Sequence, residues 1–289
     1  MTSRVEALGK AGVLTEALPY IRTYRGQTVV VKIGGQALDD PRLAAVVADD
    51  LALLALVGIK LVVVHGGGPQ VSAAMAQAGI EPAFVAGLRV TDPASMEIVR
   101  RVLIGSINSD LVARLNAAGL SGVGLSGVDG GLLEVETTSG PGGEELGLVG
   151  EVTAVDRSLV ESLLGDDRTP VIATVAPDAS GVVHNVNADA AAGAIAAAIG
   201  AAKLVYLTNV EGLYADFGDT DSLVSELKLA DLEGMLSGLS AGMRPKAASV
   251  VHALRAGVGK AHILDGRVEH ALLLEVFTDE GIGTQVLPC

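Results

Sequence analysis

The sequence has very few aromatic residues and almost no cysteine. Of its 289 residues none is tryptophan, three are phenylalanine and four are tyrosine, so a hydrophobic core must be built from aliphatic side chains. The single cysteine, Cys289, has no partner in the chain, which excludes an intrachain disulfide and a metal site built from several cysteines. The histidines show no spacing typical of metal ligands. We therefore expect no resident metal site.

Long hydrophobic runs and an excess of positive charge are also absent. The segment 190–199 is too short and too rich in alanine to span a bilayer, and the first residues do not resemble a signal peptide. The formal net charge of -14 disfavours nucleic acid or an anionic membrane as a partner. We expect a cytoplasmic protein that binds neither, with cationic side chains concentrated wherever it binds an anion.

Two strand-like segments end in glycine-rich turns. The segment 29–33 precedes Gly34 and Gly35, and the β-branched segment 61–65 precedes the glycines 66–68 and a helical pattern. Glycines let backbone N–H groups converge on an anion, and the N-terminus of a helix adds partial positive charge. Two such turns at the ends of neighbouring strands suggest a polyphosphate that is held from two sides.

Strand and helix patterns alternate along most of the chain. The order strand 28–33, helix 41–57, strand 60–65 and helix 69–79 indicates an α/β fold with a parallel sheet. The remaining patterns predict helices at 4–25, 93–104, 107–118, 156–164, 187–199, 226–237, 245–256 and 268–275, strands at 170–175, 203–208 and 260–264, and hairpins within 122–155.

Two lysines occupy positions where an isolated cation is unfavourable. Lys32 lies at the end of a buried strand, where a charge is costly unless it is paired. Pro245 fits the first turn of a helix, which places Lys246 close to the positive end of the helix dipole. A bound anion would explain both lysines better than side chains directed into solvent.

Asp189 and Arg89 each allow two interpretations. Asp189 lies with Asn185 and Asn187 at the start of an alanine-rich helix, where ordinary capping explains all three residues. Asp189 could equally lie beside the two lysines and fix their ammonium groups without cancelling both charges. Arg89 follows a glycine in an irregular loop and is either a solvated arginine or a clamp for a carboxylate.

The combination favours phosphoryl transfer. Lysines and glycine N–H groups can neutralise and align a phosphoryl group, and an acceptor that is already ionised, such as a carboxylate, needs no general base. The glycines 122, 124 and 127 match GxGxxG, but a turn and a strand pattern follow instead of the helix that a dinucleotide site requires. The chain also lacks a Walker A sequence, which disfavours a P-loop nucleotidase.

Six ordered motifs, between about residues 29 and 284, resemble those of the amino acid kinase family. They are VKIGG (31–35), VHGGGP (64–69), GLRVT (87–91), NVNAD (185–189), LTNVEG (207–212) and GMRPK (242–246). The resemblance is strongest to the branch that phosphorylates N-acetyl-L-glutamate in arginine biosynthesis. It implies a three-layer αβα sandwich with a mainly parallel central sheet. It also implies three regions, namely an N-terminal helical arm (1–25), an acceptor-substrate lobe (26–180) and a nucleotide-binding lobe (181–289).

The resemblance further implies roles for individual residues. Lys32 and Lys246 would stabilise the transferring phosphoryl group, and Asp189 would orient both lysines. ATP with Mg²⁺ would be the donor, and the product would be an acyl phosphate on the side-chain carboxylate. By the same likeness the other site residues are Gly67, Gly68, Arg89 and Asn185 for the acceptor, Gly34, Gly35 and Gly67 for the phosphoryl oxygens, and Asn209, Gly212 and Tyr214 for the nucleotide.

Two positions depart from the family pattern. Ile33 stands where the family usually has tyrosine or leucine, and Asn209 stands where it usually has aspartate, in a loop near the nucleotide. The second departure bears on the affinity for the nucleotide rather than on the class of reaction.

The two ends of the chain resemble the family members that L-arginine inhibits, in which interlaced N-terminal arms join dimers into a hexameric ring. The likeness implies an arginine site at His262, Glu275 and Gly281, feedback inhibition by L-arginine, and a hexamer built as a trimer of dimers. The alternatives are a related kinase that acts on an aminoadipate derivative, on glutamate or on carbamate, and a non-catalytic sensor of nucleotide or arginine on the same fold.

Overall fold

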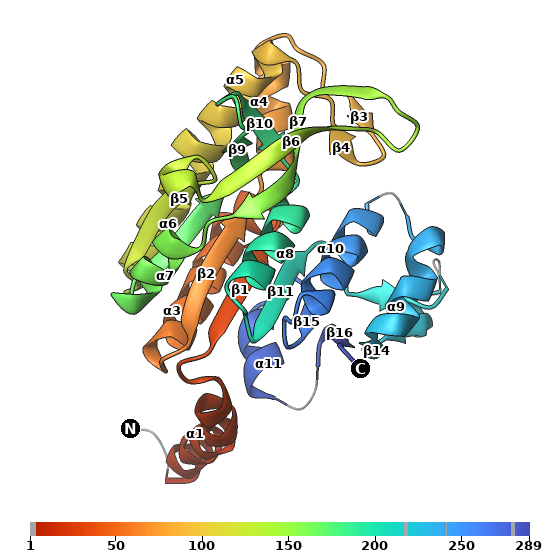
Figure 1. The fold of residues 1–289 in the computed structure, drawn as a ribbon. Coiled ribbons are helices and arrows are strands. Elements are labelled where there is room, and N and C mark those ends of the chain that lie inside the picture. The colour runs from red at the N-terminus through yellow and green to blue at the C-terminus, as the bar shows by residue number, and fades with distance from the viewer. Residues whose placement is uncertain (1–3, 217–218, 241, 279–280) are drawn as a thin grey trace.

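An eight-stranded sheet forms the centre of the computed structural model, which describes residues 4–216, 219–240, 242–278 and 281–289. Its strands are β1 (Thr28–Ile33), β2 (Lys60–His65), β5 (Gly122–Ser126), β8 (Thr169–Ala173), β11 (Lys203–Thr208), β14 (Glu226–Lys228), β15 (Ala261–Asp265) and β16 (Gly283–Leu287). Their order across the sheet is β14-β16-β15-β11-β1-β2-β8-β5 (Figure 1). Every neighbouring pair of these strands is parallel except β15 with β16, so the predicted mainly parallel sheet is confirmed.

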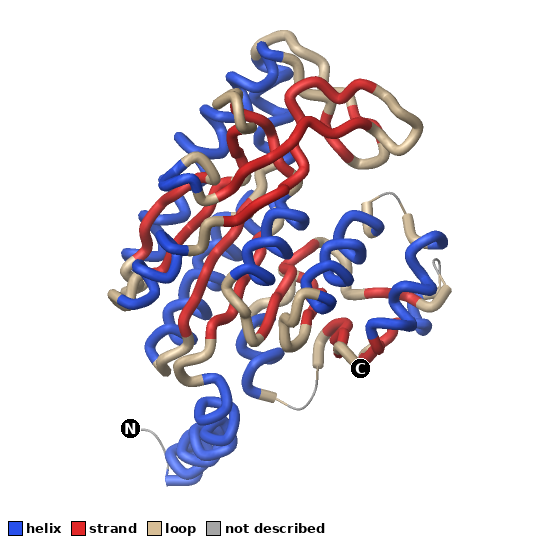
Figure 2. The backbone as a smooth tube through the Cα atoms, viewed as in Figure 1, coloured by secondary structure: helices blue, strands red, loops and turns tan. Residues whose placement is uncertain are grey.

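Helices cover both faces of this sheet and complete three layers (Figure 1, Figure 2). Their bounds are α1 (Arg4–Tyr24), α2 (Gly35–Asp39), α3 (Pro41–Leu56), α4 (Gly68–Gln77), α5 (Pro93–Arg100), α6 (Ser109–Ala117), α7 (Ser158–Gly165), α8 (Ala188–Ala198), α9 (Leu229–Met235), α10 (Arg244–Arg255) and α11 (Ala271–Phe277). Side chains of α3, α6 and α11 belong to the core on one face, and those of α7, α8, α9 and α10 to the core on the other. The predicted αβα sandwich is confirmed.

The alternation of side chains along β1 decides which way its lysine points. Val30, with Val64 of the neighbouring strand, packs in the core against α8 and α10, whereas Val29 and Val31 pack in the core against α3. Because successive side chains of a strand point to opposite faces, Lys32 points to the same side as Val30, toward α8. The strand pattern thus places a cation at the carboxyl end of a central strand.

A smaller sheet and two short hairpins complete the strands of the described residues. Their bounds are β6 (Leu133–Ser139), β7 (Glu145–Val155), β9 (Val175–Pro177) and β10 (Val183–Val186) in the sheet, β3 (Phe84–Val85) with β4 (Leu88–Arg89), and β12 (Leu213–Tyr214) with β13 (Leu223–Val224). The hairpins predicted within 122–155 are right for β6 and β7 but wrong for β5, which pairs with β8 in parallel. The glycines of β5 leave room for a neighbouring helix instead of forming a turn, because a Cβ at Gly124 would overlap Oδ1 of Asn108.

Residues 93–117 form one unbroken helical stretch, where two separate helices were predicted. A π-helix (Arg101–Asn108) joins α5 to α6, and its flanking residues keep right-handed helical dihedral angles. Gly105, at the predicted break, lies inside this π-helix. The helix predicted at 226–237 begins as β14 before α9 starts, and the last strand, β16, was not predicted. Short 3-10 helices lie at Asp129–Gly131, Thr220–Ser222 and Leu236–Gly238.

The helix α1 matches the helix predicted over 4–25 and projects from the body of the molecule (Figure 1). At its C-terminal end Tyr24 is buried and joins the core that α3 and α11 form with the sheet. Within the described residues, no helix combines the length and the apolar character that crossing a bilayer requires.

Candidate active site

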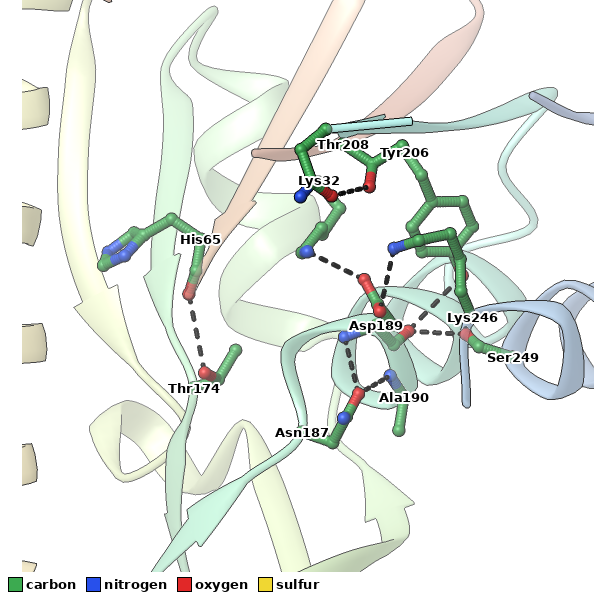
Figure 3. A network of polar contacts seen from close by, with 11 residues as sticks. Lys32, His65, Thr174, Asn187, Asp189, Ala190, Tyr206, Thr208, Lys246 and Ser249 are labelled. Carbon is green, nitrogen blue, oxygen red and sulfur yellow. Dashed lines mark hydrogen bonds and ion pairs between the residues drawn. The ribbon is translucent and has the colours of Figure 1, made fainter. Parts of the chain in front are cut away.

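Lys32, Asp189 and Lys246 come from three separate elements and meet at one point (Figure 3). Nζ of Lys32, near the end of β1, lies 2.8 Å from Oδ1 of Asp189 in the first turn of α8. Nζ of Lys246, in the first turn of α10, lies 2.9 Å from Oδ2 of the same carboxylate. Lys32 is 9% exposed and Lys246 is 4% exposed. The structure therefore brings together the three residues that the sequence predicted to be catalytic.

The charges of this cluster follow from its burial and its geometry. Burial alone would raise the pKa of Asp189, but the charges and hydrogen bonds of Lys246 and Lys32 outweigh burial and hold that pKa well below its usual range. Burial lowers the pKa of Lys246 to about 8, although the carboxylate opposes this shift. With both lysines protonated, two ammonium groups share one carboxylate and the cluster keeps a net positive charge.

Helix capping and charge pairing are divided between two residues. Oδ1 of Asn187 accepts hydrogen bonds from the N–H groups of Asp189 (2.9 Å) and Ala190 (3.0 Å), so Asn187 is the N-cap of α8. The carboxylate of Asp189 is then available to bind the lysines. Of the two interpretations left open by the sequence, capping holds for Asn187 and ion pairing holds for Asp189.

The glycine turn after β2 borders a cavity of about 210 Å³. The helix α4 begins at Gly68 with Gly67 as its N-cap and without a capping side chain, and the first N–H groups of a helix can bind an anion. A Cβ at Gly67 would overlap Cδ1 of Ile107 and lie 2.8 Å from Cδ2 of Leu103, both in the π-helix. The residues lining this cavity include Lys32, Gly66, Gly67, Gly68, Arg89, Asn185 and Asp189.

Arg89 lines the same cavity and is only 7% exposed. Its Nη2 donates hydrogen bonds to the carbonyl oxygen of Gly68 and to Oγ of Ser72, both at 2.8 Å, and its guanidinium lies 4.6 Å from the ring centroid of Phe84. No acidic side chain of the described residues pairs with it. A buried cation without an anionic partner is costly, so the structure favours the carboxylate clamp over the solvated arginine.

A second cavity, of about 530 Å³, is lined by the three residues predicted to bind the nucleotide, Asn209, Gly212 and Tyr214. Gly212 is packed so closely that a Cβ there would lie 2.9 Å from Cδ1 of Leu223. Lys246 lines this cavity, whereas Lys32 and Asp189 line the first. The lysine–aspartate cluster therefore lies where the two cavities meet. The lining residues include Thr208, Asn209, Gly212, Tyr214, Met243 and Lys246.

Gly34 and Gly35 follow Lys32 at the end of β1. The N–H of Gly34 donates to the carbonyl oxygen of Leu207 at 3.0 Å, and a Cβ at Gly34 would lie 2.9 Å from that oxygen. The N–H of Gly34, which was predicted to bind a phosphoryl oxygen, thus already has a partner. The structure supports a role for Gly34 in close packing against β11 instead. Gly35 is the first residue of α2.

His65, which the sequence suggested to be structural, contacts the glycine turn. Nδ2 of Asn108 donates to Nε2 of His65 at 3.0 Å and also to the carbonyl oxygen of Val171 at 2.9 Å. Nε2 is therefore an acceptor, and the proton is on Nδ1, 3.1 Å from the carbonyl oxygen of Gly66. Burial lowers the pKa of His65 to about 4, so the ring is neutral near pH 7. His65 and Asn108 together hold the first glycine of the turn.

A second cluster of buried charged residues joins β11, β15 and α11. Oε1 of Glu275 lies 2.5 Å from Nδ1 of His262 and 3.5 Å from Nζ of Lys203. Gly281 lies beside them, since a Cβ there would be 3.7 Å from Oε2 of Glu275. The ring of Tyr24, at the end of α1, lies 4.9 Å from Nζ of Lys203. The three residues predicted for an arginine site are thus neighbours, and Lys203 is a fourth that the sequence did not indicate.

The described residues contain no group of three or more His, Cys, Asp or Glu side chains that could hold a metal ion. Among the described residues that line the two cavities, the one carboxylate is that of Asp189, which already binds two lysines. The side chains that the structure describes therefore do not build a metal cage there.

The amino-acid sequence matches known proteins over nearly the whole chain. The sequence model of the amino acid kinase family matches residues 27–265. The acetylglutamate kinase of Acidothermus cellulolyticus is 51% identical over 286 residues, which cover 96% of this chain and 97% of that protein. The acetylglutamate kinase of Saccharopolyspora erythraea is 50% identical over 285 residues, which cover 98% and 94%.

Solved structures share the fold. N-acetylglutamate synthase from Neisseria gonorrhoeae, complexed with coenzyme A and N-acetyl-glutamate, superposes with a TM-score of 0.86 and 28% identity, over 96% of this chain and 63% of that one. This chain thus spans less than two thirds of the synthase. Carbamate kinase from Giardia lamblia bound to AMP-PNP has a TM-score of 0.66 and 16% identity, over 91% and 99%, which shows a common fold. With its sheet, its lysine–aspartate cluster and these matches, the chain belongs to the amino acid kinase family.

Proposed function

We propose that this chain transfers the γ-phosphoryl group of ATP to the side-chain carboxylate of N-acetyl-L-glutamate, as a step in arginine biosynthesis. The observation that carries the proposal is the position of Asp189, which holds Lys32 and Lys246 where two cavities meet. The names of the relatives that are about 50% identical support this acceptor.

The proposed reaction needs charge neutralisation and alignment rather than a base. A carboxylate oxygen of the acceptor bonds to the γ-phosphorus, the bond from that phosphorus to the β–γ bridging oxygen breaks, and the electron pair leaves with ADP. No proton is transferred, because the acceptor is already ionised at neutral pH. Lys32, on the acceptor side, and Lys246, on the nucleotide side, bind the oxygens of the phosphoryl group as it passes between them.

The acceptor is proposed to lie in the smaller cavity with its α-carboxylate on Arg89. Asn185 and the backbone N–H groups of Gly67 and Gly68 hold its remaining polar groups and the phosphoryl oxygens, with Gly35 on the opposite side. ATP is proposed to occupy the larger cavity at Asn209, Gly212 and Tyr214.

Because the described side chains form no metal cage, we propose that Mg²⁺ enters as part of MgATP. Phosphate oxygens and water then hold the ion, as is common for this cation. Mg²⁺ is in this view a component of the donor substrate rather than a resident cofactor of the protein.

Acyl-phosphate formation, trapped as the hydroxamate, tests the proposal. The assay compares N-acetylglutamate, glutamate, N-acetylaminoadipate and carbamate, each with MgATP. Turnover confined to N-acetylglutamate is expected. Turnover with another acceptor only would keep the mechanism and change the pathway, whereas binding of ATP without turnover on any acceptor would favour a sensor.

Replacing Arg89 with lysine is expected to raise the KM for N-acetylglutamate by about 10-fold or more, because the loss of a charge-assisted, forked contact costs on the order of 1.5–3 kcal/mol. The KM for ATP is expected to stay within about twofold, since Arg89 lines only the acceptor cavity. Initial-rate kinetics with each substrate varied in turn measure both constants. Arg100→Lys is the control, because Arg100 is exposed and pairs with Glu97. Equal rises in the KM values for N-acetylglutamate and for ATP would contradict the proposal that Arg89 binds the acceptor.

We further propose that L-arginine inhibits the enzyme by binding at His262, Glu275, Gly281 and Lys203. Burial lowers the pKa of His262 to about 4, so the ring is neutral near pH 7. Its Nδ1 is in contact with Oε1 of Glu275, and its Nε2 has no hydrogen-bond partner among the described residues. The carboxylate and the free Nε2 can accept hydrogen bonds from a guanidinium, and the Lys203 ammonium can bind a carboxylate.

Glu275→Gln is expected to raise the arginine concentration for half-inhibition by about 10-fold or more and to leave kcat within about twofold, since one charge-assisted contact is lost far from the phosphoryl site. Glu233→Gln, which alters an exposed ion pair with Arg255, is the control.

Because α1 projects from the body and its end contacts the cluster, we also propose that α1 joins dimers into a hexamer. Deleting residues 1–25 is expected to abolish the arginine response and reduce the mass measured by light scattering to that of a dimer. An unchanged response would refute the role of the arm.

A further inference from the structure

Two buried hydroxyl groups reach the backbone of the residue that joins the lysines (Figure 3). Oγ of Ser249 lies 2.5 Å from the carbonyl oxygen of Asp189, and the hydroxyl oxygen of Tyr206 lies 2.5 Å from Oγ of Ser249. Tyr206 is fully buried in β11, and Ser249 is 6% exposed in α10. Neither residue belongs to the motifs that the sequence analysis connected with catalysis.

The direction of these hydrogen bonds can be assigned. Ser249 donates its only proton to the carbonyl oxygen of Asp189, so the Ser249 oxygen accepts from Tyr206. The Tyr206 hydroxyl also lies 3.3 Å from the same carbonyl oxygen, a longer and weaker contact. Burial, and then the negative charge of Asp189, raise the pKa of Tyr206, which keeps its hydroxyl protonated. Both hydroxyls therefore reach the carbonyl oxygen of Asp189 in the first turn of α8, Ser249 directly and Tyr206 both through Ser249 and by its own longer contact.

The contact through Ser249 fixes Asp189 from the same helix face that carries Lys246. Residues three apart on a helix lie on one face, so α10 holds Asp189 at two points, through Lys246 at its carboxylate and through Ser249 at its carbonyl oxygen. Gly193 of α8 allows this close approach, because a Cβ there would overlap Oγ of Ser249 and lie 3.0 Å from its carbonyl oxygen. The ring of Tyr206 also lies 5.1 Å from Nζ of Lys246.

We propose that Tyr206 and Ser249 are positioning residues for phosphoryl transfer, an inference that rests on the proposed kinase function. They hold the backbone of Asp189 so that its two carboxylate oxygens stay aligned with Lys32 and Lys246. A rotation of Asp189 moves both ammonium groups at once, because both are bound to the same carboxylate. Both hydroxyls act through Asp189 and line neither the acceptor cavity nor the nucleotide cavity.

Tyr206→Phe and Ser249→Ala, made singly and together, test this proposal. Each is expected to lower kcat by about 10-fold, from lost alignment, while the KM values for ATP and the acceptor stay within about twofold. The double variant is expected to be slower than either single variant but by less than the product of the two effects, since the two hydroxyls bind each other and share one acceptor. Ser126→Ala is the control. Ser126 lies in the edge strand β5 and is, like Ser249, a buried serine whose hydroxyl has a hydrogen-bond partner, in this case the side chain of Asp129.

The pH dependence of kcat separates positioning from a general loss of packing. The charged groups that face Lys246 are Asp189 and Lys32, and Tyr206 is neutral beside it. A looser contact with Asp189 weakens the one interaction that keeps Lys246 protonated, so the alkaline limb of kcat is expected at lower pH in both variants. A variant that lost only stability would show a lower melting temperature and an unmoved limb.

The outcomes also separate this proposal from the proposed function. If the wild type forms acyl phosphate and both variants keep its kcat and its alkaline limb, the positioning role is overturned and the kinase function stands. If the wild type shows no turnover, the kinase function fails. The positioning of Asp189 is then tested without activity, by labelling Lys246 with an amine-reactive reagent at a series of pH values and measuring the labelled fraction by mass spectrometry. If the wild type and the variants show the same pH dependence of labelling, the positioning role of Tyr206 and Ser249 is overturned. If either Tyr206→Phe or Ser249→Ala does not fold, the remaining single variant is sufficient to test the proposal.

Discussion

Replacing Lys246 with alanine is expected to lower kcat by about 1,000-fold, because removing one preorganised charge from a transition state typically costs a factor of 10² to 10³ or more. The KM for the acceptor is expected to change little, since Lys246 lines the nucleotide cavity and not the acceptor cavity. The fold should survive, because Asp189 keeps its contact with Lys32. Coupled measurement of ADP release gives both constants.

The same lysine is expected to set the alkaline limb of activity. Only the protonated ammonium can stabilise the phosphoryl group, and burial lowers the pKa of Lys246 to about 8. The wild-type kcat should therefore be highest below this value and fall as the pH rises through it. Lys228→Ala, in the exposed edge strand β14, is the matched control and should retain both the rate and the limb. A Lys246→Ala enzyme of near wild-type kcat would exclude this lysine from the chemistry.

Replacing Gly67 with alanine is expected to lower kcat/KM for the acceptor by about 100-fold, since a displacement near 1 Å of aligned groups can cost that much. The added methyl group would overlap Ile107 and crowd Leu103, so either the π-helix or the turn that begins α4 must move. The turn is the element proposed to bind the phosphoryl oxygens. Initial rates at varied acceptor concentration measure the loss, with the melting temperature recorded in parallel.

Gly105→Ala is the matched control for this substitution. A Cβ at Gly105 meets no atom within 4 Å, and alanine favours a helical conformation. Gly105→Ala is therefore expected to keep full activity and at least the stability of the wild type. If Gly67→Ala were as active as Gly105→Ala, the close packing of the turn against the π-helix would have no role in positioning it.

The sequence was sufficient for five strands of the central sheet, because they are buried on both faces and read as short apolar runs. These strands are β1, β2, β8, β11 and β15, whereas β5, β14 and β16 were not predicted correctly. It was also sufficient to single out the two lysines, because a cation at the end of a buried strand and another in the first turn of a helix are each unfavourable without a partner. The pairing of both lysines with Asp189 was implied by the family resemblance, since the residues alone allowed capping as well. The signals for the strands and the lysines are local: each depends on a residue and its immediate neighbours in the chain.

The features that the sequence did not indicate depend on contacts between distant segments. The glycines of β5 resembled turn residues, but Gly124 instead accommodates Asn108 of a packed helix. Tyr206 looks like any apolar residue of a buried strand, and only the fold shows that its hydroxyl meets Ser249. Lys203 begins a strand without any unusual neighbour, so its burial beside Glu275 was not predictable from spacing.

The π-helix between α5 and α6 has a consequence for how this enzyme can vary. A π-helical segment arises when a helix contains one residue more than the α-helical register accommodates. In this segment Asn108 binds His65, while Ile107 and Leu103 lie against Gly67. Losing one residue here would rotate all later side chains by about 100° and yet leave a helix of similar composition. We therefore expect the deletion of one residue from this helix to be far more harmful to activity than a substitution at one of its solvent-facing positions.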